Sequence, residues 1–106
     1  MDSKSDQIRI LNDYLRTTFT GGRIVVTASI AELDRQRKAR VLLAVRKFNK
    51  FDADNDPHHE HDVAFFEVDG EHYFFKVDLY EEPDVKSANG ERVVTRVLTI
   101  MLAEEY

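Results

Sequence analysis

The sequence predicts a small α+β domain in which helices pack against an antiparallel sheet of about three strands. Two observations support this fold class. Asp69-Gly70 separates two strand-like segments and favours a two-residue hairpin turn, which would stand at the centre of the sheet. Apolar residues also recur at helical spacing in three other parts of the chain. The predicted order is helix, strand, helix, strand, strand, helix, and we expect residues 1–106 to form a single domain.

The first predicted helix spans residues 5–18, because Ile8, Leu11 and Leu15 recur at helical spacing. Ser5 is its expected cap, and Gly21-Gly22 ends the helical pattern. The β-branched run at residues 23–27 then predicts a short buried strand.

The second predicted helix spans residues 29–49. Ser29 and Glu32 have the spacing of a capping box, which indicates the start of a helix at this point. One apolar stripe follows, and basic residues occupy the remaining face. The stripe consists of Leu33, Val41, Ala44, Val45 and Phe48.

The Asp-Gly hairpin fixes a register between residues 63–68 and 71–80. If Val68 faces Glu71, then Val63 faces Lys76, and His61 faces Asp78 beyond it. One face of the hairpin is then apolar and should pack on the helices. It carries Ala64, Phe66, Val68, Tyr73, Phe75, Val77 and Leu79. Phe65 and Phe74 lie on the other face, either beneath the first or last helix or as an exposed patch for a partner.

The rest of the chain is predicted as a loop and a helix. Pro83 and Asn89-Gly90 indicate a loop over residues 81–90. Val93, Val97 and Ile100 favour a largely buried final helix over residues 92–104.

Composition narrows the function classes. The net charge is -5, which argues against direct nucleic-acid binding. No cysteine is present, so disulfides and cysteine-based metal sites are excluded. The polar N-terminus and the lack of a long apolar run predict a cytoplasmic protein without membrane insertion. Charge is also segregated, because residues 32–50 carry seven basic and two acidic side chains, whereas residues 52–84 carry twelve acidic and one basic.

Residues 52–62 form an unusual loop rich in carboxylates and histidines. It is no EF-hand, because Pro57 stands where glycine is needed and Val63 where the bidentate Glu is needed. A turn-rich structural loop, in which His61 pairs with Asp78, is the favoured interpretation. The alternative is a transition-metal site formed by three histidines and nearby carboxylates. Its candidate ligands are His58, His59, His61, Asp56, Glu60 and Asp62.

No catalytic residue is assigned from the sequence. His61, Asp78, Lys76 and Tyr80 should gather at one end of the mixed sheet face, where acid-base chemistry is conceivable. No nucleophile elbow or phosphate-binding glycine loop accompanies them. We therefore predict a protein without a cofactor that is not an enzyme.

Several stretches resemble a family of small bacterial domains of unknown function that plasmids and other mobile elements often carry. These stretches are residues 10–13, Thr20-Gly21-Gly22-Arg23, Asp54-Asn55-Asp56-Pro57 with Glu60-His61-Asp62, residues 66–70 and residues 95–106. The sequence departs from the family at His59, where the family usually has the glycine of a tight turn. The resemblance implies no established activity. It implies an accessory protein of the kind that includes anti-CRISPR and anti-restriction inhibitors.

We therefore expect a protein-binding module whose acidic loop and hairpin engage a basic surface, such as that of a nuclease complex. Its candidate contact residues are Asp54, Asp56, His58, Glu60, His61, Asp62, Asp78 and Tyr80. A metal-binding module or metal-dependent enzyme centred on residues 56–62 is the alternative, and a homodimer also stays open.

Overall fold

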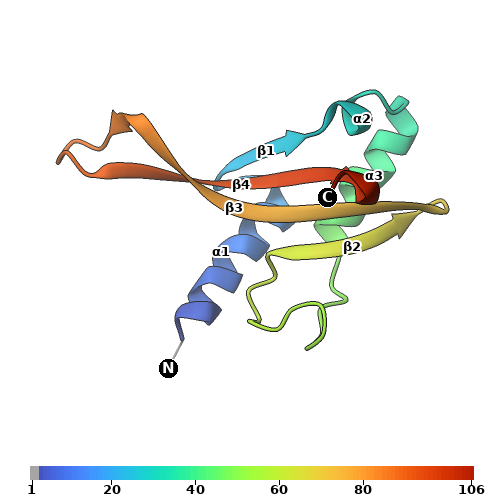
Figure 1. Cartoon of the computed structure of the whole chain (residues 1–106), viewed down its shortest axis with the longest axis horizontal. Coiled ribbons are helices and arrows are strands. Elements are labelled where there is room, and N and C mark those ends of the chain that lie inside the picture. Colours follow the sequence, from blue (N-terminus) through green and yellow to red (C-terminus); the bar gives the residue numbers. More distant parts are fainter. Residues whose placement is uncertain (1–2) are drawn as a thin grey trace.

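The fold is α+β, with three helices on one face of a mixed four-stranded sheet (Figure 1). The computed structural model describes residues 3–106, apart from the side chains at 83–85. The helices are α1 (Lys4–Thr18), α2 (Ala28–Ala31) and α3 (Arg35–Lys47). The strands are β1 (Arg23–Val26), β2 (Val63–Val68), β3 (Glu71–Lys86) and β4 (Arg92–Leu102), followed by the short 3-10 helix η1 (Ala103–Glu105). Within these residues, no helix is long and apolar enough to cross a membrane.

The predicted hairpin register is confirmed from Val63 opposite Lys76 to Val68 opposite Glu71. Asp69 and Gly70 both have positive φ, 53° and 83°, as a type I′ turn requires. Strand β3 is longer than predicted, since its backbone continues to Lys86 and takes six of the ten residues of the expected loop. The side chain of Pro83 lies outside the described residues.

The predicted final helix is wrong, because residues 92–102 form strand β4. Six of its eleven residues are β-branched, which favours a strand. The strand order is β1-β4-β3-β2, so β4 lies inside the sheet between a parallel neighbour and an antiparallel one. The apolar residues of β4 do not alternate strictly, since Val97 and Met101 are buried as well as Leu98 and Ile100, and such a near-continuous apolar run resembles that of a buried helix. The sheet is therefore mixed and has four strands, where an antiparallel sheet of about three was expected.

Two helix boundaries also differ from the prediction. Helix α1 is capped by Ser3, which forms a capping box with Asp6, so Ser5 is not the cap. The predicted second helix is divided into α2 and α3, because Asp34 caps a new helix by accepting a hydrogen bond from the Arg37 amide. Ser29 does not cap a helix. Its hydroxyl donates to Glu105 instead, at 3.0 Å.

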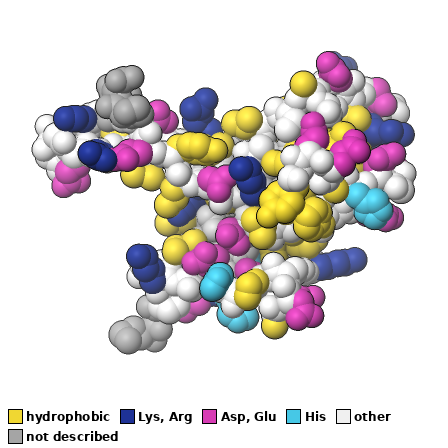
Figure 2. Space-filling model, in the orientation of Figure 1, with side chains coloured by type: hydrophobic (Ala, Val, Ile, Leu, Met, Phe, Trp, Pro, Cys, Tyr) yellow, Lys and Arg dark blue, Asp and Glu magenta, His cyan; other side chains and the backbone are white. Residues whose placement is uncertain are grey.

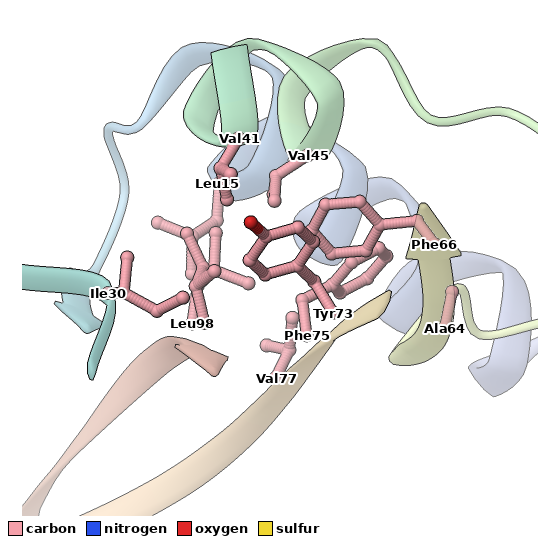
Figure 3. Close-up of a cluster of buried hydrophobic side chains, with 11 residues drawn as sticks. Leu15, Ile30, Val41, Val45, Ala64, Phe66, Tyr73, Phe75, Val77 and Leu98 are labelled. Atoms are coloured by element: carbon pink, nitrogen blue, oxygen red, sulfur yellow. The ribbon is translucent and has the colours of Figure 1, made fainter. Parts of the chain in front are cut away.

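The hydrophobic core lies between the helices and the sheet (Figure 3). Val41 and Val45 of α3 point toward Phe66, Tyr73 and Phe75 of the hairpin, as predicted. The remaining buried members of the core come from helices α1 and α2 and from strands β2, β3 and β4. They are Leu15, Ile30, Ala64, Val77, Leu98 and Ile100.

Two apolar residues that were expected in the core are exposed. Leu79 is 61% exposed and Leu11 is 53% exposed. Leu79 lies on β3 beyond the end of β2, where the helix layer no longer covers the sheet. On α1, the polar Asn12 and Arg16 are buried with Leu15, so the buried side of the helix is offset from the predicted stripe.

The sheet face opposite the helices is open (Figure 1). Phe74 is buried there by Phe65 and Tyr106, whose ring centroids lie 4.6 and 4.3 Å from its own. Phe65 itself is 58% exposed, so neither phenylalanine lies beneath a helix. Figure 2 shows the resulting apolar patch near the C-terminus. The alternative prediction, an exposed aromatic patch, describes Phe65 correctly.

Candidate functional site

The acidic loop between α3 and β2 has a defined structure built by its own side chains. One carboxylate oxygen of Asp52 accepts hydrogen bonds from the amides of Asp54 and Asn55, both at 2.9 Å. The Asn55 side chain accepts from the Asp52 amide and donates to the Lys50 carbonyl. These contacts are the Asx-type turns that Asp and Asn favour, so the structural interpretation of the loop is supported.

Asp56 is the buried centre of the loop, with 2% of its surface exposed. Its Oδ1 accepts hydrogen bonds from the amides of Glu60 and His61, at 3.0 and 3.1 Å. Its Oδ2 lies 3.4 Å from Nε2 of His61, an electrostatic contact outside hydrogen-bond geometry. His59 and His61 both have positive φ, 56° and 53°. The tight turn at His59 therefore forms with histidine in a backbone conformation that favours glycine.

His61 joins the loop to helix α1. Its Nδ1 lies 2.9 and 3.0 Å from the two carboxylate oxygens of Asp13. Its ring stacks on Phe51, with centroids 3.9 Å apart and planes inclined by 7°. The preceding residue of α1 makes a second contact with the loop, because Asn12 Nδ2 donates to the Glu60 carbonyl at 2.9 Å. The predicted pairing of His61 with Asp78 is therefore replaced by pairing with Asp13 and Asp56.

Arg16 ties this network to the protein core. Its guanidinium donates to the carbonyls of Val45 and Phe48 at the end of α3, at 3.0 and 2.7 Å. A second nitrogen donates to Asp13 at 2.9 Å. The guanidinium carbon also lies 5.2 Å from the centroid of the Phe51 ring. Arg16 is 3% exposed, and a buried cation of this kind requires a charge partner, which Asp13 provides.

Arg96 of β4 extends the network to the sheet. Its Nε donates to Asn12 Oδ1 at 3.2 Å, so Asn12 connects β4 with the loop. Burial lowers the pKa of the Arg96 guanidinium. A small cleft of about 160 Å³ lies beside this contact and brings Arg96 together with three of the predicted carboxylates, Glu60, Asp62 and Asp78.

The predicted site residues fall into three groups. The first group lies on the outside of the loop, where Asp54 and His58 are exposed and Glu60 and Asp62 are half-buried. Asp56 and His61 hold the loop from within.

Asp78 and Tyr80 form the third group, on the open face of β3. Asp78 pairs with Lys76 at 3.1 Å, and this contact raises the pKa of the lysine. Tyr80 lines a separate cleft of about 300 Å³ with Arg23 and Val25, so it is not brought together with the loop.

The candidate metal ligands do not converge. Among the residues that the structure describes, no group of three or more histidine and acidic side chains is placed to hold a metal ion. Both ring nitrogens of His61 face carboxylates, while His58 and His59 are exposed. The geometry therefore gives the metal alternative no support.

Sequence reasoning missed the polar residues that hold the loop against the rest of the domain, among them Asn12, Asp13, Arg16 and Arg96. The sequence contains one indication of these anchors, and it lies within helix α1. Asn12 and Arg16 lie four positions apart in α1, so two polar side chains share one side of a helix that also packs Leu15 into the core. No pattern within the helix indicates that the partners lie some fifty residues away in the loop.

Comparison with known proteins identifies the family. Residues 26–105 match the family described as "Protein of unknown function (DUF3768)", and the chain belongs to it. The match covers the acidic loop, the hairpin and β4. It leaves out residues 10–13 and Thr20–Arg23, where the resemblance was also noted. No curated protein and no solved structure matches the chain.

Proposed function

We propose that this DUF3768 protein is a non-enzymatic binding module that engages a basic protein surface through its acidic loop and hairpin. The observation that carries the proposal is the fixed structure of the loop. Asp52, Asn55 and Asp56 fold the loop upon itself, and His61 and Asn12 attach it to α1. A loop held in one conformation loses little entropy when it binds, which favours recognition.

The loop and the hairpin present carboxylates outward. Asp54 is exposed in the loop, and Glu60 and Asp62 lie at its edge beside Asp78. Glu67 follows on the exposed face of β2. Residues 52–84 contain twelve acidic side chains and one basic side chain, so this part of the chain carries a strong negative potential.

A nucleic-acid-binding protein has the complementary chemistry. Its channel carries Lys and Arg side chains that bind phosphates, and carboxylates on a fixed loop can occupy the same positions. Together with the resemblance to families carried by mobile elements, this chemistry favours a bacterial defence nuclease as the partner, in the manner of an anti-CRISPR or anti-restriction protein. Cytoplasmic location follows from such a partner.

The proposal is tested by capture from bacterial lysate with two charge-matched variants. The first, Asp54→Asn/Glu60→Gln/Asp62→Asn, removes three of the five acidic charges of the loop and leaves the side chains of Asp56 and His61 unchanged. The control, Glu32→Gln/Glu91→Gln/Glu104→Gln, removes the same charge from exposed residues elsewhere. Capture is compared at about 0.1 M and 1 M salt, where the screening length falls from roughly 10 to 3 Å.

The proposal predicts one partner with a basic surface that the wild type and the control retain at low salt. The loop variant and high salt should both release it. A partner that all three proteins retain at high salt would contradict a role for the acidic loop.

A further inference from the structure

Strand β2 lies at one edge of the sheet, and this edge is unprotected. Among residues 3–106, the strand order β1-β4-β3-β2 gives β2 one neighbour, β3. Its sequence, Val-Ala-Phe-Phe-Glu-Val, contains no proline and one charged residue. Natural edge strands usually carry proline, lysine or a bulge that prevents another strand from pairing with them. The free side of β2 lacks these devices.

The backbone groups on this free side can be assigned from one hydrogen bond. The Val77 amide donates to the Asp62 carbonyl at 2.7 Å, so these residues are a hydrogen-bonded pair of the ladder. Such pairs alternate along an antiparallel ladder. Ala64, Phe66 and Val68 therefore pair with β3, whereas the amides and carbonyls of Val63, Phe65 and Glu67 point away from the sheet.

A cleft of about 520 Å³ runs beside this edge. Phe65, Phe66 and Glu67 of β2 line one side, and the end of α3 and the residues after it line the other. Lys47 and Lys50 belong to that second wall. Both lysines are exposed, and among the described side chains neither forms an ion pair. The volume lies within the range of clefts that hold small ligands or peptide segments.

We propose that the free edge of β2 binds an extended segment of a partner protein as an additional strand, with apolar side chains on one face and acidic side chains on the other. The outward amides and carbonyls of Val63, Phe65 and Glu67 supply the backbone hydrogen bonds. Side chains alternate between the two faces of a strand. The apolar face of the segment covers Phe65, and the acidic face reaches Lys47 and Lys50.

The shape of the cleft favours a single strand over a second copy of the whole domain. Asn49, Lys50 and Asn55 stand beside the edge and form a wall of the cleft. A second copy paired through β2 would bring its own helix layer against this wall. It would also place its Lys47 and Lys50 near those of the first copy, and such like-charge contacts are unfavourable.

The test uses a synthetic peptide in which valine and glutamate alternate, with both ends blocked. Binding is followed by NMR chemical-shift changes in the isotope-labelled full chain. One control peptide carries N-methyl groups on alternate residues, which removes half of its backbone donors. A second replaces glutamate with lysine. The wild type should bind the glutamate peptide at least tenfold more tightly than the lysine peptide, and a Lys47→Glu/Lys50→Glu variant should show the opposite preference. Unchanged core resonances verify that the variant is folded.

We expect saturable chemical-shift changes confined to residues 63–68 and the cleft. The N-methylated peptide should not cause them, and the charge-exchanged variant should show them with the lysine peptide instead. No such shifts up to about 1 mM peptide, the weak end of specific affinity, would overturn the proposal. So would protection of the Val63, Phe65 and Glu67 amides that rises with protein concentration alone, because a second copy would then occupy the edge.

Discussion

The side chain of His61 lies between two carboxylates, and this arrangement attaches the acidic loop to helix α1. Nδ1 contacts Asp13 at 2.9 Å and Nε2 contacts Asp56 at 3.4 Å. Arg16 balances the charge of Asp13 from within the core. The loop therefore depends on polar contacts of Asp52, Asp56 and His61, whereas the side chains of Asp54, Glu60 and Asp62 contribute charge.

Asp56→Ala should lower the free energy of unfolding by about 1–3 kcal/mol, because it leaves two partly buried amides, of Glu60 and His61, without an acceptor. Asp54→Ala, in the same loop but exposed, should change it by less than about 0.5 kcal/mol. Urea denaturation measures both values. Equal effects of the two substitutions would show that Asp56 does not organise the loop.

Glu105 gives the fold a dependence on acid pH. The Leu102 amide, the Thr27 hydroxyl and the Ser29 hydroxyl donate to its carboxylate and lower its pKa below the ordinary value of 4.5. Since the folded-state pKa is the lower one, the contribution is fully present above about pH 4.5 and is lost as the pH falls through the folded value.

The Glu105→Gln variant should therefore lose less thermal stability than the wild type between neutral and acid pH. Glu104→Gln, at an exposed neighbouring position, is the matched control and should follow the wild type. Thermal unfolding over a pH series provides the measurement. A Glu105→Gln profile that coincides with the wild-type profile would be inconsistent with these hydrogen bonds.

The elements themselves show which sequence signals determine this fold. The register of β2 and β3 can be predicted from the sequence, because the Asp69-Gly70 turn and the alternating residues around it are local features. The strand character of β4 depends on its pairing with two neighbouring strands, of which β1 lies far away in the sequence. Periodicity alone does not distinguish such a central strand from a buried helix. The loop anchors were missed for the same reason, since Asp13 and His61 meet only after folding.

The parallel pairing of β1 with β4 requires a close approach at Gly22. A Cβ at this position would lie 2.3 Å from the Arg96 carbonyl oxygen and 3.1 Å from a methyl carbon of Leu15. Gly22→Ala should therefore destabilise the protein by about 1–3 kcal/mol and separate β1 from β4. The local measurement is hydrogen exchange of the Thr27 amide, which donates to Ile100 at 3.1 Å. Unchanged exchange and unchanged stability would mean that the strands do not approach this closely.

At the scale of the whole molecule, helices cover one face of the sheet and leave the other face, the edge of β2 and the acidic loop accessible (Figure 1). The basic helix α3 belongs to the helix layer and meets the acidic segment at two places, since Arg40 pairs with Asp69 at 2.7 Å and Lys47 shares a cleft with Glu67. The accessible sheet face with its aromatic patch and the fixed acidic loop support the proposal that this protein binds another protein.

The affinity of the captured partner for the two charge-matched triple variants tests this account most directly. Calorimetric titration at about 0.1 M salt should show that neutralising Asp54, Glu60 and Asp62 weakens binding by about tenfold, since each exposed ion pair contributes roughly 0.2–1 kcal/mol. The control variant at Glu32, Glu91 and Glu104 should bind like the wild type. Equal affinities of the two variants would contradict the assignment of the acidic loop as the binding surface.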